Sequence, residues 1–172
     1  MGTMKNIVVL FALSLYFVVN LNAQQDSSAM QAETNPDLLV GKCNRAELQN
    51  SEFGESFFEA YQKYNPDTET LANIKNKIFN STITIVLGTW CHDSQDHVPG
   101  FIRILDEIDY NTNYLKIICL DKNKLAGDVD ISALKIEKVP TFIFYEKNKE
   151  VGRIIETPAS TLELDTYNIL KE

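Results

Sequence analysis

Residues 82–94 read TITIVLGTWCHDS, and this stretch decides the fold. Its first six residues alternate β-branched and aliphatic side chains, which is typical of a strand buried in a sheet. The turn Gly88-Thr89-Trp90 follows, and a helical pattern begins at Cys91. A cysteine at the start of a helix lies beside unpaired backbone N–H groups and the positive end of the helix dipole. Both favour the thiolate, which is the nucleophilic form of the side chain.

The residues around Cys91 indicate a reactive thiol. His92, Asp93 and Ser94 are too polar for the surroundings of a cysteine in a core. Ser94 can turn its hydroxyl back toward the sulfur, and Trp90 can shield one side of the site while leaving the sulfur accessible. We therefore interpret Cys91 as a nucleophile and Ser94 as its stabiliser. The alternative is a structural cysteine at a helix start.

Outward from this stretch, apolar periodicity predicts a chain of alternating helices and strands. A strand–helix–strand crossover implies parallel pairing, and a short turn implies an antiparallel hairpin. The predicted fold class is therefore α/β, with a mixed central sheet flanked by helices on both faces. The expected elements are helices within 37–79, strands at 82–87, 115–120, 141–145 and 150–155, a helix at 91–108, a short helix near residue 133 and a last helix ending at residue 170.

The active-site loop and its flanks resemble the thioredoxin family. Trp90-Cys91-x-x-Ser94 after an apolar strand resembles the Trp-Cys-x-x-Cys motif of thioredoxins. Pro99 falls where thioredoxins carry the proline that kinks the active-site helix, and Val139-Pro140-Thr141 resembles the turn whose proline is cis in that family. The resemblance covers residues 82–170. It implies a thioredoxin-like domain at 37–172, made of a helical extension at 37–80 and a core at 81–172.

The resemblance also implies where a substrate binds. The positions are Trp90, His92, Val139 and Pro140. The backbone at Val139 would pair with an extended substrate segment next to the thiol. Read alone, Pro140 also fits an ordinary trans proline at the first position of a strand. His92 also fits an exposed spectator, because a protonated His92 would stabilise the thiolate whereas Asp93 would oppose it.

Two departures from the family concern the mechanism. Thioredoxins have a resolving cysteine where Ser94 stands, and a serine oxygen cannot perform thiol–disulfide exchange. They also carry a buried aspartate six residues before the first cysteine, where this chain has Ile85. In the family that acid assists the resolving cysteine, so the absence of the acid is consistent with the absence of that cysteine. Cys91 can form a mixed disulfide, but a third thiol must resolve it.

Two further cysteines bear on that third thiol. Cys43 lies in a polar segment near Lys42 and Arg45, where it could be partly ionised and exposed. We therefore take it as a possible resolving thiol, against the alternative of an incidental or structural one. Cys119 lies in the apolar run 117–120 and is expected in the core. The substrate or a small-molecule thiol could also supply the third sulfur.

The first 23 residues have the features of a secretory signal peptide. Lys5 is their only charge, residues 7–19 form an apolar run, and the stretch closes on the small residue Ala23. An uncleaved anchor is the alternative, although a membrane span takes about 20 apolar residues. Residues 24–36 are polar and read as a disordered linker. We expect a periplasmic or secreted protein without a stable membrane span after cleavage.

The charge balance argues against nucleic-acid binding. The chain has 16 Lys plus Arg, 24 Asp plus Glu and a formal net charge of −8. Such a surface repels nucleic acid, and no basic cluster offsets it. The two histidines and three cysteines lack the spacing of a zinc site, so we expect neither a metal nor another cofactor.

These observations lead to two functional hypotheses. The preferred one is a monothiol oxidoreductase or isomerase that exchanges disulfides on extracytoplasmic proteins, its clients, and needs an external thiol or redox partner for resolution. The alternative is a non-catalytic binding module that holds clients in its groove or through a long-lived mixed disulfide. Peroxide reduction by Cys91 is less favoured, because thioredoxin-fold peroxidases place their cysteine in a Thr- and Pro-rich loop that this motif does not resemble.

Overall fold

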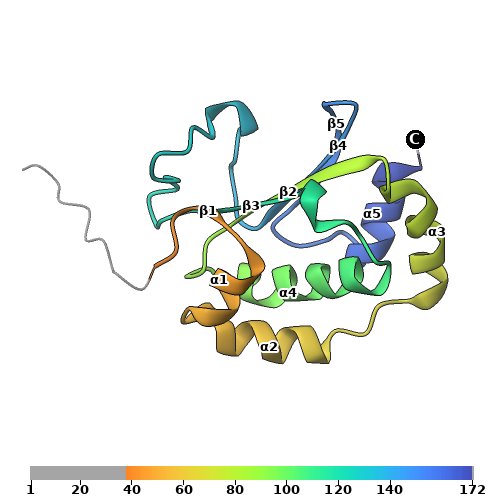
Figure 1. Cartoon of the computed structure of the whole chain (residues 1–172), viewed down its shortest axis with the longest axis horizontal. Helices are drawn as coiled ribbons and strands as arrows, with labels where there is room; N and C mark the ends of the chain where they lie inside the picture. The colour runs from red at the N-terminus through yellow and green to blue at the C-terminus, as the bar shows by residue number, and fades with distance from the viewer. Residues whose placement is uncertain (1–37, 172) are drawn as a thin grey trace, which may run out of the picture. The chain divides into compact units, whose positions relative to one another are not determined.

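The computed structural model describes residues 38–171, so the predicted signal peptide at 1–23 and linker at 24–36 lie outside the described residues. Five strands form one sheet in the order β1-β3-β2-β4-β5 (Figure 1). The strands are β1 (Gly41–Cys43), β2 (Ser81–Leu87), β3 (Leu115–Cys119), β4 (Thr141–Glu146) and β5 (Lys149–Ile155). The helices are α1 (Arg45–Asn50), α2 (Phe53–Lys63), α3 (Thr68–Ile78), α4 (His92–Glu107) and α5 (Leu162–Leu170), with 3₁₀ turns η1 (Thr112–Tyr114) and η2 (Ser132–Leu134).

Strand β2 forms the centre of the sheet. It pairs in parallel with β3, where Ile85 lies beside Ile117, and antiparallel with β4, where Ile85 lies beside Phe142. The connection from β2 to β3 contains α4, as a parallel pair requires. Strands β4 and β5 form a hairpin whose turn residues, Lys147 and Asn148, have φ values of 50° and 63°. Positive φ at both positions is typical of a tight hairpin turn. The predicted mixed sheet flanked by helices is confirmed.

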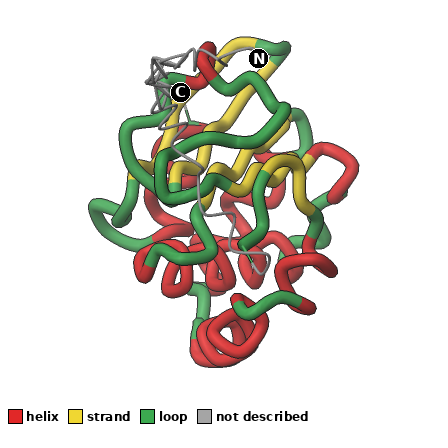
Figure 2. The backbone as a smooth tube through the Cα atoms, turned by 90° about the vertical axis from the view of Figure 1, so that its left-hand side faces the viewer, coloured by secondary structure: helices red, strands yellow, loops and turns green. Residues whose placement is uncertain are grey.

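The two faces of the sheet are covered differently. In β2, Ile85 and Leu87 belong to a larger core, while Val86 between them belongs to a smaller one. The larger core contains buried residues of all five α-helices. The smaller core lies under residues 121–139, which we call the covering segment and which contain η2 as their helical turn (Figures 1 and 2). One face of the sheet is therefore covered almost entirely by loop, whereas the sequence predicted helices on both faces.

Helix α4 packs its apolar side into the larger core. The ring centroid of Phe101 lies 4.7 Å from that of Phe142 and 5.9 Å from that of Phe144. Burying a side chain of this kind stabilises the fold by about 1.5–3 kcal/mol. On the other side of α4, a Cβ at Gly100 would lie 2.6 Å from a ring carbon of Tyr64. The glycine therefore allows the end of α2 to pack closely on α4.

The predicted helical extension at 37–80 contains a strand that the sequence analysis missed. Strand β1 pairs antiparallel with β3 and sets Cys43 opposite Ile117. Three residues are too few to show the alternation that identifies a strand. The predicted helices that follow are present, and Phe53 and Phe57 of α2 are buried in the larger core. Cys43 thus lies half-buried in an edge strand, where the sequence predicted a polar and exposed segment.

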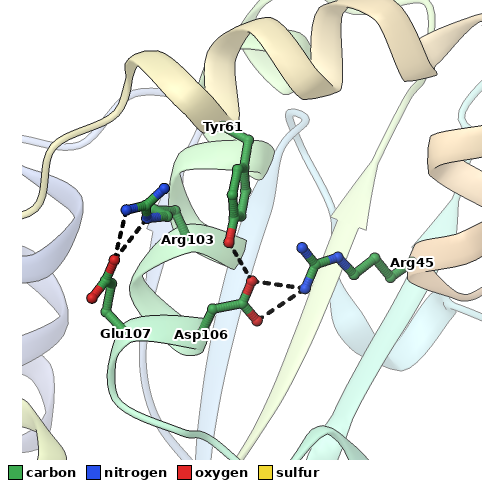
Figure 3. Close-up of polar contacts among 5 residues, drawn as sticks. All are labelled: Arg45, Tyr61, Arg103, Asp106 and Glu107. Carbon is green, nitrogen blue, oxygen red and sulfur yellow. Dashed lines mark hydrogen bonds and ion pairs between the residues drawn. The ribbon is translucent and has the colours of Figure 1, made fainter.

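A polar cluster joins α1, α2 and α4 (Figure 3). Arg45 Nη1 donates to both carboxylate oxygens of Asp106, at 2.9 and 2.7 Å, and the Tyr61 hydroxyl donates to Asp106 at 2.6 Å. The guanidinium carbon of Arg45 lies 5.3 Å from the centre of the Tyr61 ring. Burial, together with the Asp106 carboxylate, raises the pKa of Tyr61. Asp106 therefore fixes the residues that follow β1 against α4.

A buried carboxylate ties α5 to the connection between α2 and α3. Glu163 is 4% exposed and accepts hydrogen bonds from the Tyr64 hydroxyl at 2.5 Å and from the Asp67 backbone N–H at 3.0 Å. Burial and the Glu163 carboxylate raise the pKa of Tyr64 well above its ordinary value, so its hydroxyl keeps its proton. Two segments about 100 residues apart are joined by this one side chain.

We expect Glu163→Ala to lower the free energy of unfolding by about 1–3 kcal/mol, because it leaves two buried donors without an acceptor. Urea unfolding followed by circular dichroism would measure the change. Glu163→Gln keeps a carbonyl oxygen and should lose clearly less. An alanine variant as stable as the unmodified protein would contradict this role.

Candidate thiol site at the start of helix α4

Cys91 is the N-cap residue of α4, with extended backbone at φ −92° and ψ 126°. Its N–H donates to the Gly88 carbonyl at 2.9 Å, which closes the turn after β2. The half-buried side chain packs against the smaller core. Its thiol donates to the carbonyl oxygen of Val139, 3.3 Å from Sγ. The structure thus brings together two of the positions that the sequence motifs single out.

The backbone on both sides of Val139 is held by hydrogen bonds. The Val139–Pro140 peptide bond is cis, as the resemblance implied. The Pro140 carbonyl accepts the N–H of Glu156 at 2.7 Å, and the Thr141 hydroxyl donates to the Lys138 carbonyl at 2.6 Å. The carbonyl that receives the thiol's hydrogen bond is therefore part of a fixed turn.

Trp90 lies over the turn that precedes Cys91. Its indole N–H donates to the Leu120 carbonyl at 2.9 Å, and the Leu120 N–H donates to Leu87 at 2.8 Å. A Cβ at Gly88 would lie 2.7 Å from the indole ring, so the glycine makes room for it. The indole thereby links the end of β2 to the segment after β3.

Ser94 lies fully buried in the first turn of α4. Its hydroxyl oxygen accepts the Gly88 N–H at 3.3 Å. Between residues 38 and 171 the structure shows no hydrogen bond from this hydroxyl to the Cys91 sulfur, which bonds to Val139 instead. The predicted contact with the thiol is therefore not formed here. In this structure, Ser94 braces the turn that carries Cys91.

The exposed side of the site carries charged groups. The His92 side chain is 83% exposed and turned toward Asp96, with Nε2 3.4 Å from a carboxylate oxygen. Lys138 forms an ion pair with Glu156, which is the main cause that raises the pKa of Lys138. The negative charge of Asp93 adds to that rise, so Asp93 acts on the turn before β4 across the site.

The structure does not bring Cys43 and Cys91 together. Cys91 packs against the smaller core and Cys43 against the larger, on opposite faces of the sheet. The reason is the position of β1, which lies at the sheet edge beyond β3. This arrangement gives no support to Cys43 as the resolving thiol of Cys91. Cys119 is fully buried, as predicted, and all three cysteines are free.

The position of the missing aspartate is an apolar core position. Ile85 is fully buried in the larger core, between Ile117 and Phe142 on the neighbouring strands. An ionised carboxylate in such surroundings would need a partner. This core is therefore built without the acid that assists a resolving cysteine in the family.

Two further findings concern the described part of the chain. Residues 38–171 contain no group of three or more His, Cys, Asp or Glu side chains placed to hold a metal ion. No helix in the same range is both long and apolar enough to cross a bilayer.

Comparison with known proteins agrees with the fold. A family model described as Thioredoxin matches residues 45–167, which is more than half of the chain, and the chain therefore belongs to the thioredoxin family. No curated protein matches it.

Solved structures with a similar backbone have low sequence identity to this chain. A protein of unknown function from Pseudomonas aeruginosa is 13% identical at a TM-score of 0.51, covering 69% of this chain and 82% of its own. Thioredoxin from Trypanosoma brucei brucei is 21% identical at a TM-score of 0.35, covering 62% and 88%. Mitochondrial thioredoxin 3 from Saccharomyces cerevisiae is 17% identical at a TM-score of 0.35, covering 59% and 92%. The first of these supports a shared fold and nothing further, whereas membership of the family indicates thiol–disulfide chemistry on protein thiols in general.

Trp90 is the only tryptophan of the chain and is adjacent to Cys91, so its fluorescence should report the state of that thiol. We expect a mixed disulfide at Cys91 to quench the emission and a reducing agent to restore it, because a disulfide close to an indole quenches its excited state. The measurement is a titration with an aromatic disulfide followed by tryptophan emission. The Cys91→Ser variant is the control, and an equal change in that variant would contradict the assignment.

Proposed function

We propose that this protein is a monothiol thiol–disulfide exchanger that acts on extracytoplasmic client proteins through Cys91. The observation that carries the proposal is the half-exposed Cys91 sulfur at the start of α4, 3.3 Å from the Val139 carbonyl, with a buried serine at the position of a resolving thiol. A helix N-terminus is a favourable position for a negatively charged group. The general redox chemistry of the family supplies the reaction type.

The first step is an attack by the Cys91 thiolate on a client disulfide. One Cys91–client S–S bond forms, the client S–S bond breaks, and the departing client sulfur leaves as a thiolate. The proton of Cys91 is lost to solvent before the attack. Its hydrogen bond to Val139 is then broken, so the Val139 carbonyl is free to accept an N–H from an extended client segment. The Val139 carbonyl thus accepts a hydrogen bond from the Cys91 thiol before ionisation and from the client afterwards.

The second step needs a thiol that this site does not supply. Ser94 occupies the position of the resolving thiol, and Cys43 lies on the other face of the sheet. A second cysteine of the client, or an external thiol, therefore expels Cys91. When the client's own cysteine does so, the net reaction is disulfide isomerisation, in which client and protein end with no net change in oxidation state.

A second candidate function is retention of clients without turnover. It is favoured by the Ser94 hydroxyl, which bonds to Gly88, and by the lack of any other thiol on the Cys91 side of the described domain. Under this reading the mixed disulfide is the end state and persists until external reductant is added. The lifetime of the adduct distinguishes the two functions.

The extracytoplasmic location rests on the sequence of residues 1–23. N-terminal sequencing of the protein purified from its native cell envelope or medium would test it. A mature chain that begins close to residue 24 is the expected result. A chain that retains the first 23 residues in the cytoplasmic fraction would overturn this part of the proposal.

We expect Cys91→Ala to reduce exchange with a scrambled-disulfide client to the level of the uncatalysed reaction, because no other thiol occupies the site. The measurement is the recovery of native client activity in a glutathione buffer. Glu59→Ala, on the exposed side of α2, is the matched control and should retain full activity. Unchanged activity of Cys91→Ala would refute the proposal.

We expect Ser94→Cys to convert the site into a dithiol that releases its client without external thiol. An intramolecular thiol acts at a high effective concentration, so release should accelerate by about tenfold or more. Single-turnover release of a labelled client from the reduced protein, resolved by non-reducing electrophoresis, measures the rate. Ser94→Ala is the control and should leave the adduct in place. Rapid release from the unmodified protein would instead contradict the retention alternative.

A further inference from the structure

Cys43 and Cys119 are neighbours on the helix-covered face of the sheet. In the antiparallel pair of β1 and β3, Gly41 lies opposite Cys119 and Cys43 lies opposite Ile117. The two cysteines are therefore diagonal partners, and since side chains alternate along a strand, both point to the same face. Both pack in the larger core, whereas Cys91 packs in the smaller one.

The two thiols influence each other's ionisation. Interaction with the Cys119 thiol is the main cause that lowers the pKa of Cys43, whose own thiol donates to the Gly41 carbonyl at 3.5 Å. The same interaction and burial raise the pKa of Cys119. The half-buried Cys43 is therefore the more nucleophilic sulfur of the pair, and the fully buried Cys119 stays a thiol beside it.

Cys43 also lines a cavity of about 330 Å³ between β1, β3 and α4. Ile102, Leu105 and Ile117 form apolar wall, and Arg45 and Asp106 contribute the polar part, as the ion pair in Figure 3. A cavity of this size is at the lower end of the range for small-molecule sites. The nucleophilic sulfur of the pair therefore faces a space that can admit a small reagent.

We propose that Cys43 and Cys119 form a second redox centre, which is oxidised by a small disulfide that enters this cavity. The centre is separate from Cys91, because the sheet lies between them. It requires neither a client protein nor the turn at Val139. It goes beyond the proposed function and stands or falls independently of it.

The oxidation proceeds in two balanced steps. The Cys43 thiolate attacks one sulfur of the small disulfide, forms a mixed disulfide and expels one small thiolate, which takes a proton from solvent. The negative charge at Cys43, one cause of the raised pKa of Cys119, is thereby removed. Cys119 then loses its proton, attacks the Cys43 sulfur and expels the second small thiolate. The two protein thiols are oxidised to one disulfide, and the small disulfide is reduced to two thiols.

Closing this disulfide requires a local change in β1. Diagonal partners in a sheet are about 7–8 Å apart at Cα, whereas disulfides span about 4.4–6.8 Å. Strand β1 has three residues and pairs with β3 alone, so few ladder hydrogen bonds oppose such a shift. Arg45, the first residue of α1, is anchored to Asp106, so the shift is confined to the strand and its flanks.

The test uses the full chain with Cys91→Ala, so that the Cys91 site is silent. The reduced variant is incubated with 2-hydroxyethyl disulfide, the remaining thiols are alkylated, and peptides are mapped by mass spectrometry. We expect a disulfide between the Cys43 and Cys119 peptides as the main product. Adding Cys119→Ala should trap the hydroxyethyl adduct on Cys43, whereas adding Cys43→Ala should leave Cys119 unreacted.

Three outcomes would overturn the proposal. The first is free Cys43 and Cys119 under conditions that oxidise Cys91 in the unmodified protein. The second is a stable adduct on Cys43 in the presence of Cys119, which would show a lone reactive thiol. The third is oxidation between chains only, seen as a covalent dimer. Because the unmodified protein can be mapped in the same way, a misfolded double variant does not leave the question open, and loss of client exchange on Cys91→Ala bears only on the proposed function.

Discussion

The pairing of β2 on both of its edges is the constraint on which the site depends. Its antiparallel register with β4 sets Val86 opposite Thr141. The residues that follow Val86 and those that precede Thr141 therefore run side by side past the end of the ladder. Cys91 and Val139 lie on these two extensions, which is why two residues 48 positions apart in the sequence form a hydrogen bond of 3.3 Å. A slip of one residue would turn every side chain of β2 to the other face and remove the contact.

The sequence predicted what depends on local periodicity and on recognisable turns. The strand at 82–87, the helix after Cys91 and the final hairpin are present within a residue or two, because each has a pattern long enough to detect. Strand β1 was missed since three residues carry no period. The partner of Cys43 was also missed, because cross-strand register is a tertiary property. The direction of the Ser94 hydroxyl depends on the Gly88 N–H, which no spacing in the sequence reveals.

Ser94 has a structural role in addition to standing where the family has a second cysteine. Fully buried, and bonded to the backbone of the turn, Ser94 contributes to the shape of the loop that carries Cys91. Ile85 contributes apolar packing at the position where the family carries an acid. Both side chains belong to the interior around α4, which holds the loop in place.

The covering segment and α4 differ in how their backbones are held. The backbone of the covering segment is held by its own turns, such as those in which the Asp121 side chain accepts the N–H groups of Asn123 and Leu125 at 2.8 Å, and not by a strand ladder. Regions of this kind open at lower free energy than a helix packed in a core. We therefore expect residues 121–137 to open more readily than α4, whereas the turn at Val139 stays held by the hydrogen bonds at Lys138 and Pro140. Opening of this kind would expose the smaller core and leave the packing around α4 intact.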